Sequence, residues 1–239
     1  MNRPLTPAAR TRPAGRSNMS CPCSRPCQGA PDNTPLMRHG DVFRFERGDR
    51  LWGQGDAADS VIAICTGAVK TVREWPNDKG MIVDLVFRGG IAGSESALPS
   101  ARRPTTCVAL SSGRAVRVGI GKLRQLVAED LEVAHALLKA SARAQIGFSD
   151  RIDETQLGPV EQRLARVLLR IGDEVGLRDS RGTFVPVALS RGDLADLVGC
   201  RVETTIRIMT KWQRGDVVDT QREGIVLKDR AALEKAAGV

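Results

Sequence analysis

Between residues 41 and 120 the chain alternates short apolar, β-branched runs with glycine-containing turns. Residues 42–45 (Val-Phe-Arg-Phe) alternate apolar and polar positions, and further strand-like runs follow at 60–65, 68–74, 81–87, 105–110 and 114–120. Glycines separate them at positions 48, 53, 55, 67 and 80. Short strands at this spacing predict an antiparallel sandwich or barrel.

The apolar period changes near Lys122. Residues 122–155 contain no proline and few strand formers, which predicts a long dimerisation helix over 122–157. On a heptad count, one seam position holds Leu131, Leu138, Gln145 and Ile152, and the other holds Ala134, Ser141 and Phe148. We expect two copies of the chain to pair through this seam, because a helix this long outruns a small barrel. The alternative is a helix that packs on its own barrel.

A second domain begins near Gly158-Pro159 and contains a helix-turn-helix pattern. Ser190 is a good N-cap with Asp193 three positions on, and the helix that they start runs to about Val198. Gly199 supplies a turn, and a second helix follows over 202–212. Helix, glycine-containing turn and helix is the arrangement that places a recognition helix in the major groove of DNA.

The start of this second helix carries side chains suited to reading bases. Glu203 can accept from cytosine N4, and Arg207 can donate two hydrogen bonds to guanine. Lys211 and Arg214 lie further along, where they are better placed for phosphate, and residues 215–219 and 224–227 resemble a two-stranded wing with Arg222 at its turn. The predicted DNA-binding residues are Arg201, Glu203, Thr204, Ile206, Arg207 and Lys211.

Composition agrees with a nucleic-acid partner. The 239 residues carry a net charge of +8, which suits a polyanion, and the length suits two modest domains. No apolar stretch approaches the ~20 residues that span a bilayer, so we expect a cytoplasmic protein without a membrane partner. A nucleophile–base pair and a phosphate-binding loop are not recognisable, so we do not expect an enzyme.

Three cysteines lie close together before the first strand. Cys21, Cys23 and Cys27 belong to a Pro-, Arg- and Ser-rich segment over residues 1–34 that we expect to be a flexible leader. Clustered thiols in a protein without a secretory signal more often bind a metal or sense redox state than form a disulfide framework.

Residues 36–239 resemble the CRP/FNR superfamily of bacterial transcription regulators. The resemblance rests on residues 48–56 and 61–67 in the barrel and on 161–165, 190–195 and 202–207 in the C-terminal domain. It implies an α+β fold: an antiparallel β-roll (a cupin-like jelly roll) over 35–121, the dimerisation helix, and a winged helix-turn-helix over 158–239. It also implies a homodimer that binds a palindromic double-stranded DNA site, reads it with Glu203 and Arg207, and contacts RNA polymerase. Val202 resembles the FNR branch, whereas Ile206 stands where FNR has a serine.

The resemblance suggests two alternative effectors for this chain. In the superfamily, a cyclic-nucleotide pocket needs a glutamate and then an Arg-Ser or Arg-Thr pair for the phosphate. This chain has Glu95 and Arg103, but Pro104 follows Arg103. Proline has neither an N–H nor a hydroxyl, so two phosphate donors are missing at this position. We therefore expect no cyclic nucleotide. The other effector is an FNR-like iron–sulfur cluster (4Fe-4S), which takes four thiolates and would sense oxygen, nitric oxide or redox state.

The leader supplies three thiolates, and the fourth must come from elsewhere. Where FNR-like proteins have the barrel cysteine, this chain has Val116. We expect Cys107 to replace it, because its strand directly precedes that of Val116 and could be an antiparallel neighbour; Cys65 is the alternative. A zinc site and a thiol–disulfide switch remain open as rival uses of the same cysteines. FNR also keeps an acidic residue in its seam, at the position aligned with Phe148, so the switch here would act on dimer geometry.

Overall fold

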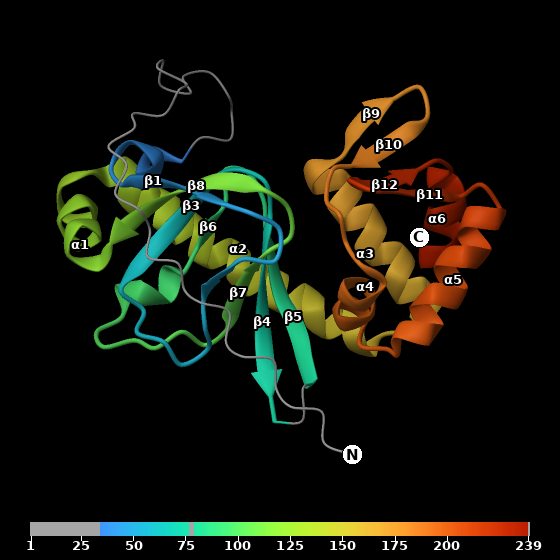
Figure 1. The fold of residues 1–239 in the computed structure, drawn as a ribbon, viewed down its shortest axis with the longest axis horizontal. Coiled ribbons are helices and arrows are strands. Elements are labelled where there is room, and N and C mark those ends of the chain that lie inside the picture. Colours follow the sequence, from blue (N-terminus) through green and yellow to red (C-terminus); the bar gives the residue numbers. More distant parts are fainter. Residues whose placement is uncertain (1–33, 77–78, 239) are drawn as a thin grey trace.

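The structure is a computed structural model that describes residues 34–76 and 79–238 (Figure 1). The predicted leader with Cys21, Cys23 and Cys27 therefore lies outside the described residues. The rest forms a β-roll, a long connecting helix and a C-terminal helical domain with a small sheet, so the predicted α+β architecture is confirmed.

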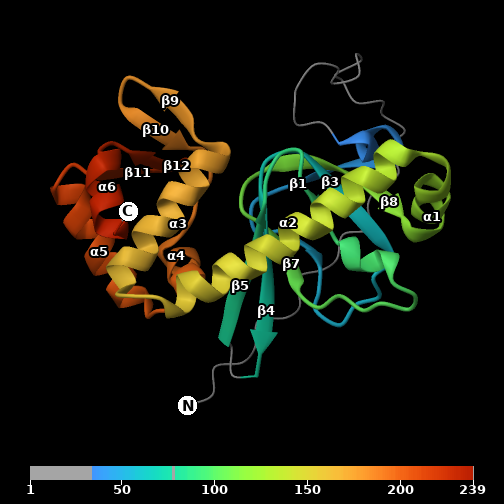
Figure 2. The same cartoon turned by 180° about the vertical axis from the view of Figure 1, so that it is seen from behind.

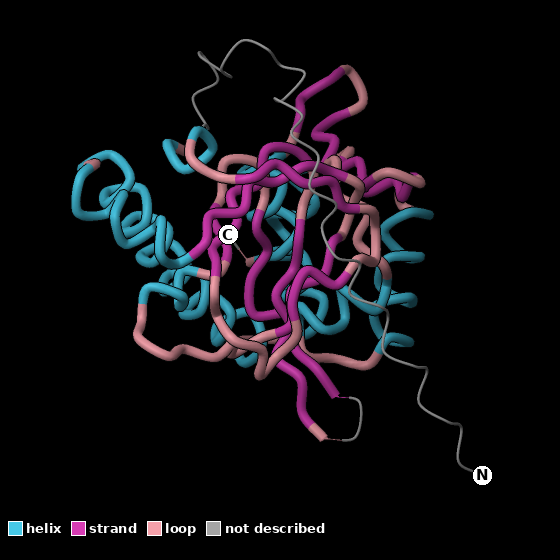
Figure 3. The backbone as a smooth tube through the Cα atoms, turned by 60° about the vertical axis from the view of Figure 1, so that its left-hand side comes forward, coloured by secondary structure: helices cyan, strands magenta, loops and turns pink. Residues whose placement is uncertain are grey.

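The β-roll consists of two four-stranded antiparallel sheets. One has the order β1-β8-β3-β6 and the other β2-β7-β4-β5. The elements are η1 (Pro35–Arg38), β1 (Asp41–Phe45), β2 (Arg50–Trp52), β3 (Ser60–Thr66), β4 (Val69–Trp75), β5 (Lys79–Val86), β6 (Ile91–Ala92), η2 (Ser94–Ala97), β7 (Thr106–Ala109) and β8 (Gly113–Gly119). The hairpin of β4 and β5 projects beyond the rest of the roll (Figures 1 and 3).

The helical stretch expected over 122–157 is divided in two, which corrects the prediction of one continuous helix. Helix α1 runs over Ile120–Glu129 and α2 over Leu131–Gln156. Asp130 leaves the helical conformation (φ −123°, ψ 104°), and its side chain accepts hydrogen bonds from the backbone N–H groups of Glu132 and Val133. The aspartate therefore starts a new helix instead of continuing the old one.

Helix α2 packs against the roll with one side only. Val133 and Leu137 are buried in a cluster with Leu36 of η1 and Val116 of β8. The helix then runs from the roll to the C-terminal domain, as the view from behind shows (Figure 2). Its other side is left uncovered along the predicted seam.

The C-terminal domain is a helix-turn-helix with a four-stranded sheet of order β11-β12-β10-β9. The predicted wing is present as the β11–β12 hairpin. The β9–β10 hairpin and α6 were not predicted. The elements are α3 (Val160–Val175), β9 (Leu177–Asp179), β10 (Gly182–Val185), α4 (Arg191–Val198), α5 (Val202–Arg214), β11 (Val218–Gln221), β12 (Gly224–Leu227) and α6 (Arg230–Ala237).

The two domains share one hydrophobic core. Ile82, Leu85 and Phe87 of the β4–β5 hairpin region belong to the same buried cluster as Leu164 and Leu194 of the C-terminal domain. Two polar contacts reinforce this packing. Lys70 of β4 forms a largely buried ion pair with Asp193 of α4, and the Arg47 guanidinium donates to the carbonyl of Ala188 at 2.9 Å.

Candidate DNA interface and sensor site

The first helix of the helix-turn-helix is fixed at both ends by local chemistry. Ser190 and Asp193 form a reciprocal capping box: the Ser190 hydroxyl accepts from the Asp193 N–H, and the Asp193 carboxylate accepts from the Ser190 N–H. Gly199 ends the helix in the left-handed region (φ 61°), where glycine is favoured. Burial raises the pKa of Asp193, but hydrogen bonds from Lys70 and Ser190 outweigh this effect and lower it, which favours the charged form of this cap in the folded protein.

Helix α5 is amphipathic, and its outer face carries most of the predicted DNA-binding residues. Thr205, Ile208, Met209 and Trp212 are buried beneath it and anchor the helix. Thr204 is half-buried between the two faces. The exposed positions at and near its N-terminus are Arg201, Val202, Glu203, Ile206 and Arg207.

Lys211 is also exposed, one helical turn after Arg207. Its ammonium group pairs with the Glu161 carboxylate at 2.9 Å, and the indole N–H of Trp212 donates to the same carboxylate at 3.1 Å. Glu161 therefore ties α3 to α5. Arg222 is exposed at the tip of the wing, as the sequence predicts.

The predicted dimer seam is the uncovered side of α2. Leu131 is 85% exposed, Leu138 67%, and Phe148 and Ile152 52% each, and Gln145 is exposed among them. Apolar side chains at seven-residue spacing on one exposed stripe are typical of a helix that lacks its partner.

The arginine expected at a nucleotide phosphate site is occupied by internal partners. The Arg103 side chain is 2% exposed. Its guanidinium donates to Glu95 at 2.9 Å and to the Ser60 carbonyl at 2.5 Å, and lies 4.2 Å from the centre of the Trp52 ring. The Pro104 carbonyl accepts from Arg73. The charge of Arg103 is thus already balanced by Glu95, and its guanidinium is stacked on Trp52.

Sheet order corrects the reasoning that favoured Cys107. Strand β7, which carries Cys107, pairs with β2 and β4, whereas β8, which carries Val116, pairs with β1 and β3. Val116 therefore lies between β1 and β3, and of these two strands β3 carries Cys65. The sequence did not reveal this because β7 and β8 are consecutive in the chain but belong to different sheets.

The two barrel cysteines lie in different environments. Cys107 is fully buried in the interior of the roll, among Phe45, Trp52 and Ile64. Burial raises the pKa of the Cys107 thiol far above its ordinary value. Cys65 is half-buried near the end of β3 and packs against the outer cluster that holds Leu36 and Val116.

Within the described residues no three histidine, cysteine, aspartate or glutamate side chains are grouped to hold a metal ion. Cys65 and Cys107 would each need further ligands from elsewhere. Cys200, in the turn before α5, lies 3.2 Å from the Thr205 hydroxyl and is half-buried.

Ionisable groups gather where the domains meet. Arg151 is buried and pairs with Glu154 at 2.7 Å, and Glu154 also accepts from Arg170 of α3 at 2.7 Å. Asp84 of β5 lies nearby, and burial raises its pKa to about 6. Sequence analysis missed this group and the Lys70–Asp193 pair, because Asp84 and Arg170 meet Arg151 and Glu154 from other elements and Lys70 is 123 residues from Asp193.

Two known family models match this chain, one in the β-roll and the start of the helical stretch and the other in the C-terminal domain. Residues 42–130 match the cyclic nucleotide-binding domain, and residues 162–236 match the Crp-like helix-turn-helix domain. Across residues 34–76 and 79–238, no helix is both long and apolar enough to cross a membrane.

Curated relatives and solved structures cover most of the chain. The CRP-like cAMP-activated global transcriptional regulator of Mycobacterium tuberculosis is 22% identical over 81% of this chain and 86% of its own length. The fumarate and nitrate reduction regulatory protein of Escherichia coli is 21% identical over 81% and 77%. FixK2 from Bradyrhizobium japonicum superposes with a TM-score of 0.71, at 20% identity, over 82% of this chain and 96% of that structure. The two curated relatives are named as a transcriptional regulator and a regulatory protein.

Proposed function

We infer that this chain, which belongs to the CRP/FNR family of DNA-binding transcription regulators, acts as a homodimer that binds palindromic double-stranded DNA and communicates with RNA polymerase. The observation that carries this proposal is the outer face of α5, where Glu203 and Arg207 are exposed above a buried anchor. In such a helix-turn-helix the N-terminal residues of the second helix reach base edges in the major groove.

Paired α2 helices would supply the twofold symmetry. The uncovered stripe from Leu131 to Ile152 would bury its apolar side chains against the partner, and half-sites would lie about one helical turn (~34 Å) apart. Phe148 adds apolar area to this seam, so we expect the dimer to persist without an effector.

A DNA-binding assay tests the proposal directly. We expect Arg207→Ala to weaken binding to a selected palindrome by about 5- to 150-fold, equivalent to about 1–3 kcal/mol, and to relax specificity at one base pair. Arg124→Ala, which removes an exposed cation from α1, is the matched control. Fluorescence anisotropy at fixed salt measures both. Equal affinity of all three proteins for the palindrome and for random DNA would contradict base reading by α5.

For the effector, we propose an iron–sulfur cluster held by Cys21, Cys23, Cys27 and one barrel thiol. A bound cluster of this kind supplies an oxygen- and nitric oxide-sensitive group. The chain's part is to provide four thiolates. In the described residues only Cys65, Cys107 and Cys200 are cysteines, and Cys200 lies in the DNA-binding turn.

Cys65 fits the fourth position better than Cys107. Cys65 lies on the strand next to β8 and packs on the outer side of the roll against the cluster that holds Leu36. Leu36 is only two residues after Thr34, the first described residue, so Cys65 is near the point where the leader joins the roll. Cys107 points into the apolar interior, where ionising the thiol is costly. The hydrophobic cluster against which Cys65 packs also contains Val133 and Leu137 at the start of α2. A leader bound to Cys65 through the iron–sulfur cluster would therefore lie close to this helix and affect its position.

Anaerobic purification with iron and sulfide analysis separates these assignments. We expect about four irons per chain in the wild type and in Cys107→Ala, and loss of the cluster in Cys65→Ala. The reverse pattern would assign the fourth ligand to Cys107. A colourless protein with stoichiometric zinc would indicate a zinc site instead of the cluster. A protein with a reversible disulfide and no metal would indicate a thiol–disulfide switch.

The environment of Arg103 argues against a cyclic nucleotide as the effector. Binding a phosphate there would require the guanidinium to leave Glu95 and the Ser60 carbonyl. We expect no saturable calorimetric signal with cyclic AMP at micromolar protein concentration. Saturable binding that Arg103→Ala abolishes would overturn this expectation.

A further inference from the structure

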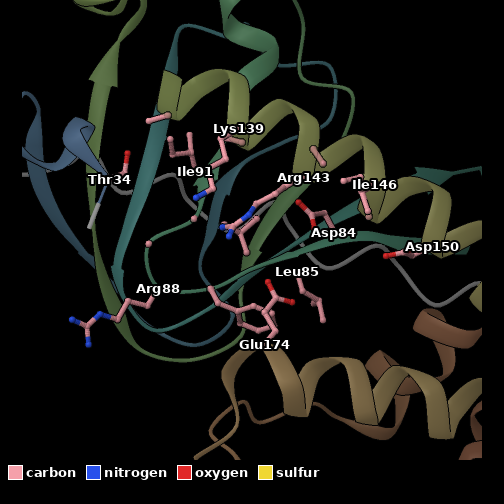
Figure 4. Close-up of a pocket in the computed structure, with 18 of the residues that line it drawn as sticks. Thr34, Asp84, Leu85, Arg88, Ile91, Lys139, Arg143, Ile146, Asp150 and Glu174 are labelled. Atoms are coloured by element: carbon pink, nitrogen blue, oxygen red, sulfur yellow. The ribbon is translucent and has the colours of Figure 1, made fainter. Parts of the chain in front are cut away.

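A cavity of about 570 Å³ lies where the roll, the dimer helix and the C-terminal domain meet. Figure 4 shows its lining side chains, which come from β5 and the turn after it, from α2, and from α3. Thr34 and Pro35 line one end. The cavity shares no lining residue with the space around Arg103.

The cavity exists because α2 presents small side chains to β5. Ala136, Ala140, Ala144 and Gly147 line it, where larger residues would fill the gap. Arg88, Lys139 and Arg143 of its lining are exposed, so the space is open to solvent and a ligand can enter it.

The cavity would remain open in the proposed dimer. The lining positions 136, 143 and 150 lie on the side of the helix turned away from the seam positions 131, 138, 145 and 152, because successive residues rotate by about 100°, whereas Ala144 lies nearer the seam, one turn before Phe148. A partner helix on the seam therefore leaves the entrance clear.

Two cations on α2 form no close ion pair with another described residue, although the charge of Arg143 partly opposes the rise in the pKa of Glu174. Lys139 and Arg143 both line the cavity, while Arg88 extends away from it (Figure 4). Across the described parts of the chain neither α2 residue has an ion pair within 4 Å, whereas Arg170 on the facing helix is paired with Glu154. Like charges four residues apart repel on a helix, and an anion between them would reverse that cost.

A buried hydroxyl at the end of the cavity is also unpartnered. Thr34 is 8% exposed, and its Oγ1 has no hydrogen-bond partner among the described residues. Buried hydroxyls are normally hydrogen-bonded. On the other side of the cavity the carboxyl groups of Asp84 and Glu174 offer acceptors, and burial raises the pKa of each.

We propose that this cavity is a second ligand site, which binds a small organic anion, a carboxylate or a phosphate ester that also carries a hydrogen-bond donor. Lys139 and Arg143 hold the anionic group, and Asp84 and Glu174 accept from the donor. A ligand there touches the roll, α2 and α3 at once, so it stabilises whichever arrangement of the three closes around it.

Calorimetric titration of the full chain tests the site without DNA or metal. The probes are glycolate, a carboxylate with a hydroxyl donor, and inorganic phosphate, whose protonated oxygen donates; together they separate carboxylate from phosphate recognition, each at ionic strength matched with chloride. We expect saturable binding of at least one probe and a loss of about tenfold or more in Lys139→Ala/Arg143→Ala. The control is Lys122→Ala/Arg124→Ala, which removes two exposed cations from α1.

A second variant tests the cavity independently of charge. Ala140→Leu should fill part of the space and weaken binding of the same probe while both cations remain. Far-ultraviolet circular dichroism and thermal melting identify variants that do not fold. Absence of saturable binding by both probes, equal loss in the α1 control, or unchanged affinity in the folded Ala140→Leu variant would each overturn the proposal.

Discussion

Replacing Asp84 with asparagine should stabilise the protein at neutral pH. Burial raises the pKa of this carboxyl from 3.8 to about 6, although Arg151 and Arg170 partly oppose the shift. The difference between a pKa of 3.8 and one of about 6 corresponds to about 3 kcal/mol of preference for the neutral form in the folded protein. The charged form therefore weakens the folded state, and asparagine removes that charge while keeping an oxygen acceptor.

The sign of the pH dependence follows from this direction. Below about pH 4 the carboxyl is protonated in both folded and unfolded chains, so it imposes no penalty. Between about pH 4 and 6 the unfolded chain loses its proton first, and the stability contributed by the neutral group declines. Above about pH 6 the folded protein carries the full penalty.

Urea denaturation at pH 4.5, 6 and 7.5 measures the effect. Asp84→Asn should exceed the wild type by up to about 3 kcal/mol in unfolding free energy at pH 7.5, and the difference should shrink towards acidic pH. Asp153→Asn, an exposed change on the same helix as Arg151, is the control. A variant that is less stable than wild type at pH 7.5 would refute the reasoning, because it would mean that the carboxylate is net-stabilised by its arginine neighbours.

Three further outcomes follow from other contacts. Lys70→Met should lower the unfolding free energy by up to about 3 kcal/mol, since it leaves Asp193 buried without its partner; denaturant melts check this, and an unchanged midpoint would contradict it. Leu138→Glu should give a monomer in analytical ultracentrifugation, whereas a persisting dimer would exclude the α2 seam. Gly199→Val should cost about 1–3 kcal/mol, because a β-branched residue is strained at φ 61°; a thermal melt equal to wild type would show that the turn relaxes.

Local patterns in the sequence predicted the elements that local chemistry determines. The capping box at Ser190, the glycine turn at Gly199 and the amphipathic recognition helix are all defined by residues within a few positions of one another, and each is present. The exposed seam of α2 follows from periodicity alone. These features could be predicted because the residues that cause them are neighbours in the chain.

The sequence could not predict what depends on pairing between distant segments. Asp130 resembles an ordinary polar position of a long helix, and its role as an N-cap depends on where α1 packs. The placement of β3, which carries Cys65, beside the strand of Val116 depends on sheet order, which the strand pattern does not specify. Lys70 and Asp193 are 123 residues apart, so no local signal links them.

The shared core between the β4–β5 hairpin and the C-terminal domain also limits how such regulators can be recombined. Ile82 and Leu85 are buried against the same cluster as Leu164 and Leu194. In a chimera whose residues 158–239 are replaced by those of another regulator, Ile82 and Leu85 would face foreign side chains in place of their own packing partners. Exchange of DNA specificity should therefore succeed by grafting the exposed positions of α5, whereas exchange of the whole C-terminal domain should require the hairpin to move with it.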